Sequence, residues 1–151
     1  MNESALSLEG LTIVALTGAL VICCVLFHYE AFTVLHKTLG RLQVHIRRRR
    51  ILLLMFSLLA LHVGEIWLFG LGYDLILSHH GASEIRGAQD QGLLESVYFS
   101  AVVYTTLGLG DLAPVGPLRF MAGTESLTGF LLITWSASFT FLEMQRFWKN
   151  T

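Results

Sequence analysis

The sequence predicts an all-α membrane protein, with three transmembrane helices and a shorter re-entrant helix and loop in each chain. Composition is the first reason: of 151 residues, 54% are hydrophobic and only 14% are charged, with a mean hydropathy of +0.62, which is unusual for a soluble domain. The second reason is that three mostly apolar segments are longer than the about 20 residues that a spanning helix needs: residues 8–29, 51–77 and 118–141. Residues 92–104 are too short to span, and fit a helix that enters the membrane and returns inside protein.

The first predicted unit, residues 1–35, is an N-terminal transmembrane helix. Glu3 and Glu9 lie where a secretory signal peptide carries positive charge, so we expect this span to be retained. Cys23 and Cys24 are adjacent within it, where a disulfide would be strained. We therefore expect both thiols to serve as packing residues.

A basic linker is predicted next, at residues 36–50, and it indicates the topology. Eight of the ten cations fall between the first two spans or after the third: Lys37, Arg41, Arg47, Arg48, Arg49, Arg50, Arg146 and Lys149. Because Lys and Arg mark the cytoplasmic side, the N-terminus is expected outside and the C-terminus inside a cell membrane. The run 47–50 could bind anionic lipid at about 1 kcal/mol per charge, or could serve only to fix the topology.

Residues 51–145 form the second predicted unit. It consists of a helix at 51–77, an outer loop at 78–91, a short helix at 92–104, a loop at 105–111 and a last helix at 118–145. A short cytoplasmic tail, 146–151, follows, and we expect no attached regulatory domain there. His79 and His80 in the outer loop are a weak metal signal without a third ligand, so a solvated loop is the expectation.

The loop after the short helix carries the most specific pattern in the chain. It reads Thr105-Thr106-Leu107-Gly108-Leu109-Gly110-Asp111. Glycines at alternate positions tolerate backbone dihedrals that other residues resist, so successive carbonyls could face one axis and replace the water shell of a cation. The Thr106 hydroxyl could add another oxygen, and Asp111 could concentrate cations at the outer mouth. An ordinary glycine turn is the alternative.

This loop and its surroundings resemble the pore of the potassium channel family, over roughly residues 51 to the C-terminus. The stretch 98–104 resembles the family's pore helix, 105–111 its selectivity filter, and the segments 51–77 and 118–145 its outer and inner helices. The resemblance implies a homotetramer, because one loop cannot surround an ion. The additional first helix departs from the minimal two-span pore.

Two filter positions differ from the commonest form of the family. Leucine stands at 107 in place of valine, and leucine at 109 replaces a tyrosine whose hydroxyl holds the filter taut. Apolar packing against Phe99 is expected to take its place, and Val102 stands where some relatives carry an acid. Potassium remains the favoured ion, with sodium or rubidium as further permeant ions.

Ionisable residues at membrane depth are costly, at about 2.5 to 3.5 kcal/mol on insertion scales, and so suggest function. Glu125 could be protonated, or could brace the filter by accepting hydrogen bonds from Thr105, Tyr104 or Ser100. His62 and Glu65 share a helix face by their i, i+3 spacing and are expected to reach Glu125. A pH-sensitive cluster and a static polar contact both remain open.

The inner helix suggests a gate. By the resemblance, Gly129 falls at the family's hinge, although a glycine there could simply permit close packing. Five residues would line the conduction path at helical spacing: Phe130, Ile133, Ala137, Phe141 and Gln145. Phe141 is the candidate for a hydrophobic gate that closes by dewetting, and packing against lipid or a neighbouring helix is its alternative.

Together these observations predict a potassium-preferring channel that needs no cofactor beyond its permeant K+. Its expected partners are its own copies and membrane lipid, with no nucleic acid. No catalytic triad, metal set or phosphate loop appears in the sequence, so an enzyme is not expected. A non-selective cation channel and a non-conducting subunit that keeps the pore fold are the alternatives.

Overall fold

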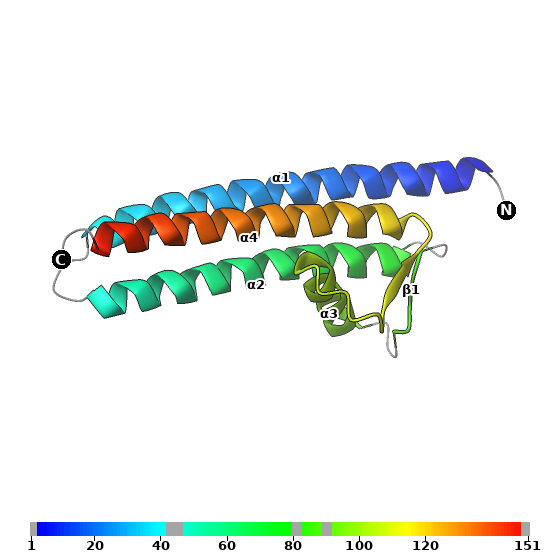
Figure 1. The fold of residues 1–151 in the computed structure, drawn as a ribbon. Coiled ribbons are helices and arrows are strands. Elements are labelled where there is room, and N and C mark those ends of the chain that lie inside the picture. The colour runs from blue at the N-terminus through cyan, green and yellow to red at the C-terminus, as the bar shows by residue number, and fades with distance from the viewer. Residues whose placement is uncertain (1–2, 42–46, 80–82, 89–91, 149–151) are drawn as a thin grey trace.

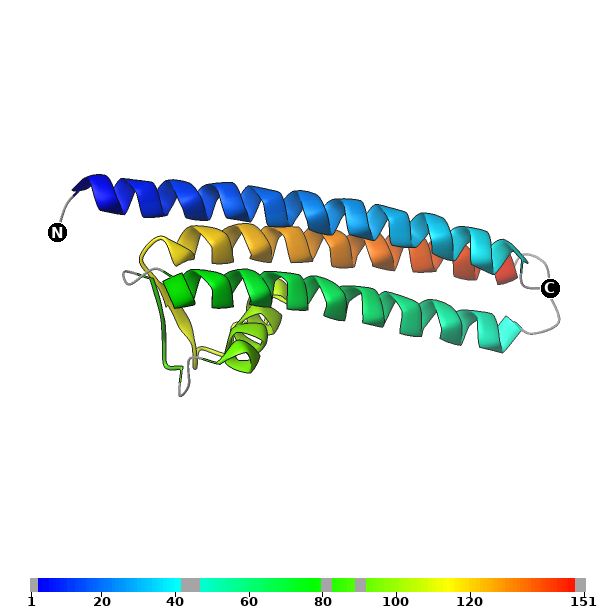
Figure 2. The same cartoon turned by 180° about the vertical axis from the view of Figure 1, so that it is seen from behind.

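The computed structural model describes residues 3–41, 47–79, 83–88 and 92–148, with side chains described for 8–38, 49–79, 83–88 and 92–145. It contains the helices α1 (Glu3–Arg41), α2 (Arg47–His79), α3 (Leu93–Tyr104) and α4 (Leu118–Trp148), and the strands β1 (Glu84–Arg86) and β2 (Ala113–Val115). The three long helices lie side by side, and α3 leans against α2 near one end of the bundle (Figure 1). Seen from behind, the N-terminus lies at the end that carries the strands and the C-terminus at the other (Figure 2).

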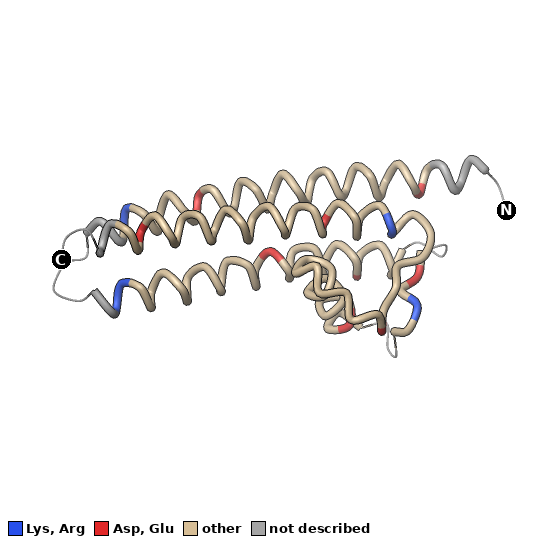
Figure 3. Tube along the Cα trace, viewed as in Figure 1, with Lys and Arg blue, Asp and Glu red and all other residues tan. Residues whose placement is uncertain are grey.

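The prediction of an all-α membrane protein is confirmed. Within the described residues, three helical segments are long and apolar enough to cross a membrane: Leu8–Thr38, Arg49–His79 and Leu118–Gln145. Among the described residues, Lys and Arg lie toward the helix ends and in the loops, whereas some acidic residues also occur along the middle of the helices (Figure 3). The apolar segments thus define the fold. The acidic side chains within them need hydrogen-bond partners, because an unpaired carboxylate is costly away from water.

Several predicted boundaries are wrong. The linker 36–50 is much shorter, because α1 continues to Arg41 and α2 already begins at Arg47; residues 42–46 lie outside the described part. The first helix likewise exceeds its predicted end at residue 35, and the last passes residue 145 into the predicted tail. At the predicted end of the first helix, Leu35 packs with Leu54, Leu58 and Leu61 of α2, and the apolar segment itself continues to Thr38.

The outer loop 78–91 contains a strand that was not predicted. β1 pairs antiparallel with β2, with Ile85 opposite Pro114. Gly87 permits this ribbon, since its φ is +93° and an added Cβ would lie 2.1 Å from the carbonyl oxygen of Asp111. The ribbon therefore ties the loop before α3 to the end of the 105–111 segment.

Two apolar clusters hold the helices together. The larger joins all four helices and includes Ile13, Phe69, Phe99 and Leu132. The smaller lies toward the other end of the bundle and packs Phe32 and Leu35 of α1 against Leu54, Leu58 and Leu61 of α2. The first helix is thus packed against the rest of the chain along much of its length.

Candidate functional site

The pore-helix candidate α3 is held by its buried face, formed by Ser96, Phe99, Ser100, Val102 and Tyr104. The helix ends with two backbone hydrogen bonds: the Thr106 N–H donates to the Val103 carbonyl at 3.0 Å, and the Leu107 N–H donates to the Val102 carbonyl at 3.1 Å. This pairing is a Schellman motif, which requires a left-handed residue just past the helix. Thr106 fills that place with φ of 56°, and a β-branched residue there is a strained exception of the kind found at functional sites.

The loop after α3 alternates in backbone conformation. Positive φ occurs at Thr106, Gly108 and Gly110, with values of 56°, 57° and 84°, while Thr105, Leu107 and Leu109 have negative φ. Where such alternation is between right- and left-handed residues, it turns successive N–H groups to one side, which would leave the carbonyls on the other. All of residues 105–111 are exposed in the single chain, so these carbonyls are open to a ligand or to another subunit.

The outer end of the loop is fixed by a contact that sequence reasoning missed. The Tyr98 hydroxyl donates to Oδ2 of Asp111 at 2.7 Å. This hydrogen bond raises the pKa of the Tyr98 hydroxyl above its usual range. The Tyr98 hydroxyl therefore holds the loop at Asp111, whereas the side chain of Leu109 has no hydroxyl that could do so.

Behind the loop, Glu125 is fully buried and forms hydrogen bonds with two hydroxyls. Ser100 lies 2.5 Å from its Oε1, as predicted, and Tyr73, which was not predicted, donates to its Oε2 at 2.5 Å. The Ser100 hydroxyl also lies 2.8 Å from the Ile66 carbonyl. Since Ser100 has one hydrogen, both of its contacts are satisfied together only when Glu125 carries a proton and donates it.

The other predicted partners of Glu125 lie elsewhere. The Thr105 hydroxyl donates to the Ala101 carbonyl at 2.7 Å, and the Tyr104 hydroxyl donates to Glu65 at 2.5 Å. The predicted contact of His62 and Glu65 with Glu125 is also wrong, because Tyr104 reaches between the helices to meet them. Two separate buried carboxylates therefore brace α3, at different depths.

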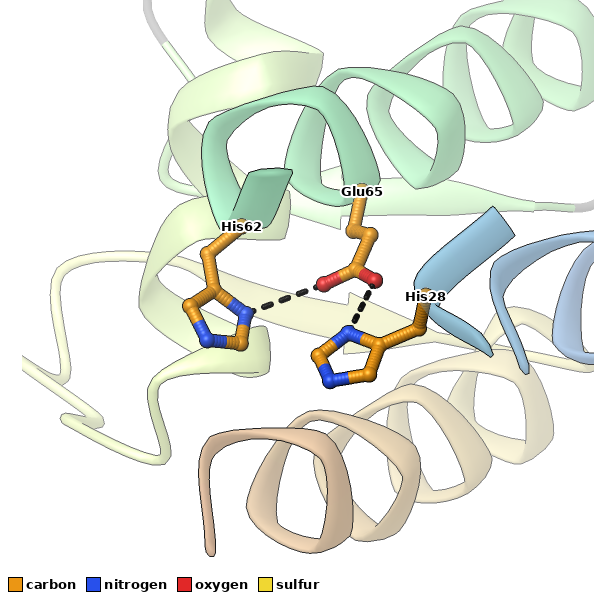
Figure 4. A group of neighbouring side chains, drawn as sticks. All are labelled: His28, His62 and Glu65. Atoms are coloured by element: carbon orange, nitrogen blue, oxygen red, sulfur yellow. Dashed lines mark hydrogen bonds and ion pairs between the residues drawn. The ribbon is translucent and has the colours of Figure 1, made fainter. Parts of the chain in front are cut away.

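Glu65 is the centre of the second cluster. Its Oε1 lies 2.8 Å from Nδ1 of His28 on α1, and its Oε2 lies 3.0 Å from Nδ1 of His62 on α2 (Figure 4). The Ser136 hydroxyl on α4 lies 3.0 Å from Nε2 of His62 and 3.4 Å from Nε2 of His28. With Tyr104 from α3, side chains of four helices meet here. His28 and Ser136 were missed, since only folding brings them to the predicted His62–Glu65 pair.

Predicted support residues lie on the buried side of α3. Phe99 is 1% exposed and meets the Tyr73 ring edge to face, with 4.9 Å between centroids. Val102 is also buried, and its carbonyl accepts the helix-ending bond from Leu107. Leu109 is 58% exposed in the single chain, so its predicted packing against Phe99 stays a prediction.

The inner helix α4 approaches α3 closely at Gly129, where an added Cβ would lie 2.2 Å from the Tyr104 carbonyl oxygen. The structure thus bears out the close-packing alternative for Gly129, and a hinge there stays a prediction. Four of the predicted pore-lining residues are exposed and the last is half-buried: Phe130, Ile133, Ala137, Phe141 and Gln145. They leave a face of α4 available to a pore or a neighbouring subunit, and their roles stay predictions.

At the opposite end of the bundle, the basic run begins α2. Arg49 is exposed, whereas Arg50 is partly buried, with Nη2 3.5 Å from Oε2 of the buried Glu143 on α4. Nδ1 of His36 lies 3.6 Å from Oε1 of the same carboxylate. Arg50 therefore contacts protein, while lipid binding by the basic run stays a prediction, and the side chains of Arg47 and Arg48 lie outside the described part.

Comparison with known proteins gives two matches. The model of a family described as ion channel matches residues 52–146, which include α3, the alternating loop and most of α2 and α4. The chain is also 38% identical, over 79 residues, to an uncharacterized membrane protein, YdjJ, of Bacillus subtilis (strain 168). That alignment covers 49% of this chain and 23% of the relative's length. No solved structure matches the chain.

Proposed function

The chain belongs to this ion channel family, and from that premise we propose that it is a potassium-preferring cation channel. Ions pass down their gradient through a tetrameric pore whose filter is formed by residues 105–110 of each chain. Asp111 stands at the outer mouth and attracts cations. The first helix is an addition that packs against the pore unit.

The observation that carries the proposal is the alternation of φ from Thr105 to Gly110. A backbone of this kind can aim several carbonyls at one line, which is the coordination that replaces the hydration shell of a dehydrated cation. Uncharged carbonyl oxygens suit a weakly hydrated monovalent ion, and potassium is the physiological ion of that kind. The strained Thr106 supports this reading, because an ordinary glycine turn has no need of a left-handed β-branched residue.

The tetramer is proposed because the pattern occurs once in the chain, and one loop offers oxygens on one side of an ion only. Exposed apolar side chains on α4 are consistent with this assembly, since Phe130 and Phe141 are 58% and 56% exposed in the single chain. In the tetramer these residues face the conduction path or a neighbouring subunit. Their exposure in one chain is thereby explained.

We place the protein in a cell membrane with the filter and N-terminus outside and the C-terminus in the cytoplasm. The support is the distribution of cations, since Lys37 near the end of α1 and Arg49 and Arg50 at the start of α2 lie at the end of the bundle opposite α3 (Figure 1). The exposed Arg49 at that end is positioned to meet an anionic lipid headgroup. Passive conduction of this kind involves no catalysis.

The test is ion flux into proteoliposomes that contain the full chain, with potassium or sodium as the only permeant cation. We expect potassium flux well above sodium flux. Equal fluxes would replace the proposal by a non-selective cation channel. No flux of either ion from protein that runs as a tetramer would favour a non-conducting subunit.

A further inference from the structure

When both histidines donate from Nδ1 to Glu65, the buried cluster around that carboxylate has one hydrogen-bond donor too few for its acceptors. Both Nδ1 atoms face the carboxylate, and both Nε2 atoms lie within hydrogen-bond distance of the Ser136 hydroxyl. If each Nδ1 carries the proton and donates to Glu65, each Nε2 is an acceptor, and the Ser136 hydroxyl has one hydrogen for the two. One ring nitrogen then has no donor from this hydroxyl, in a cluster where His28 and Glu65 are 0% exposed.

A cation between the two Nδ1 atoms and the carboxylate resolves this mismatch. Both rings then carry their protons on Nε2, and both can donate to Ser136, whose oxygen has two lone pairs. The Tyr104 hydroxyl remains a donor to Oε2 of Glu65 at 2.5 Å. Donation from the second ring nitrogen and hydrogen bonds to a ligating carboxylate are the usual outer partners of protein metal sites.

The geometry points to a divalent transition-metal site of the zinc class, with His28, His62 and Glu65 as the protein ligands. One ligand atom from each of these residues lies within 4.8 Å of the others. Zinc bonds of about 2.0 to 2.2 Å to nitrogen and oxygen place ligand atoms about 3.3 Å apart in a tetrahedral site, so small side-chain rotations suffice. Two imidazoles and one carboxylate suit zinc, whereas magnesium and calcium prefer oxygen ligands alone.

The site also has access and a fourth neighbour. His62 is 17% exposed, so the cluster is not sealed from the surface of the chain. The Tyr104 hydroxyl lies 3.0 Å from Nδ1 of His62 and 2.5 Å from Oε2 of Glu65, so it is a further polar neighbour of the three ligands.

Such an ion would join the first helix to the filter. His28 belongs to α1 and contacts Glu65, which also accepts a hydrogen bond from Tyr104. The residue after Tyr104 is Thr105, where the alternating loop begins. The proposal gives α1 a role in holding the pore unit. It stands apart from conduction, because metal binding is measured without ion flux.

Metal content is the direct test, on full chain purified without a histidine tag and stripped with a chelator. After incubation with zinc and gel filtration, we expect one zinc per chain by elemental analysis. His28→Gln and His62→Gln should lose that zinc, whereas His36→Gln and His79→Gln, which alter exposed histidines on the same two helices, should keep it. Cobalt in place of zinc should give a visible absorption band that follows the same pattern.

Ser136→Ala provides a second variant that keeps all three ligands. Loss of an outer-shell partner weakens metal affinity about 10- to 100-fold, while Ser138→Ala, an exposed serine on the same helix, should leave the affinity unchanged. The proposal is overturned if the native chain takes up no zinc or cobalt, in which case a shared proton resolves the mismatch. It is also overturned if His28→Gln binds as much metal as the native chain.

Discussion

Gly108→Ala tests the link between backbone conformation and conduction. Gly108 has φ of +57° and nothing within 4 Å of an added Cβ in the chain, so the substitution acts through conformation and meets no steric clash there. A left-handed residue other than glycine costs roughly 1 to 2 kcal/mol. In a tetramer the four substitutions together destabilise the conducting conformation of the filter by about 4 to 8 kcal/mol. The population of that conformation then falls by about a thousandfold or more.

Potassium flux in proteoliposomes measures this effect, with protein quantity and tetramer content matched between samples. Gly18→Ala is the control, since Gly18 lies in α1 with ordinary helical φ and nothing within 4 Å of an added Cβ. Alanine is the better helix former there by about 1 kcal/mol. We expect native flux from the control and loss of flux from Gly108→Ala. The reasoning is refuted if Gly108→Ala conducts like the native chain or if both variants fail alike.

Three further predictions concern stability and selectivity. Gly129→Ala places a Cβ 2.2 Å from the Tyr104 carbonyl oxygen, so overpacking should lower the free energy of unfolding by about 1 to 3 kcal/mol, seen as earlier thermal unfolding in detergent. Glu125→Leu leaves the buried Tyr73 hydroxyl without its acceptor and removes the partner of the Ser100 hydroxyl, so it should cost about 1 to 3 kcal/mol, whereas Glu125→Gln keeps both an acceptor and a donor and should cost less. Tyr98→Phe removes the donor to Asp111 on an exposed side chain, so thermal unfolding should stay within about 0.5 kcal/mol of native, and the potassium preference measured from reversal potential should fall.

Each of these predictions has a matched control or a contrary result. Gly123→Ala alters α4 where an added Cβ meets nothing within 4 Å, and should not lower stability. Equal unfolding temperatures for the Leu and Gln variants of Glu125 would contradict the hydrogen-bond account. An unchanged reversal potential in Tyr98→Phe would show that the outer brace has no part in selectivity.

Much of the fold could be predicted from the sequence because it depends on local properties. Apolar length fixes the three spans, and the alternate glycines at 108 and 110 suggest a loop with positive φ, which both residues have. Helix ends were less predictable, since the apolar segment of α1 continues to Thr38 and Leu35, at the predicted end of that helix, packs against α2. The strand at 84–86 was missed because its partner lies beyond α3 in the sequence.

The polar contacts could be predicted only where the partners are near in sequence. The His62–Glu65 pair follows from helical spacing, and Ser100 was among three hydroxyls expected at Glu125. His28 lies 37 residues from Glu65, and Ser136 lies 108 residues from His28, so helix packing alone decides that they meet. The strained Thr106 has no sequence signal beyond its place at the end of α3.

The central claim is selective conduction, and the reversal potential tests it most directly. The full chain is placed in a planar bilayer with potassium chloride on one side and an equal concentration of sodium chloride on the other. We expect a reversal potential displaced from zero toward the potassium equilibrium value. Steady cation currents that reverse at zero would contradict potassium preference.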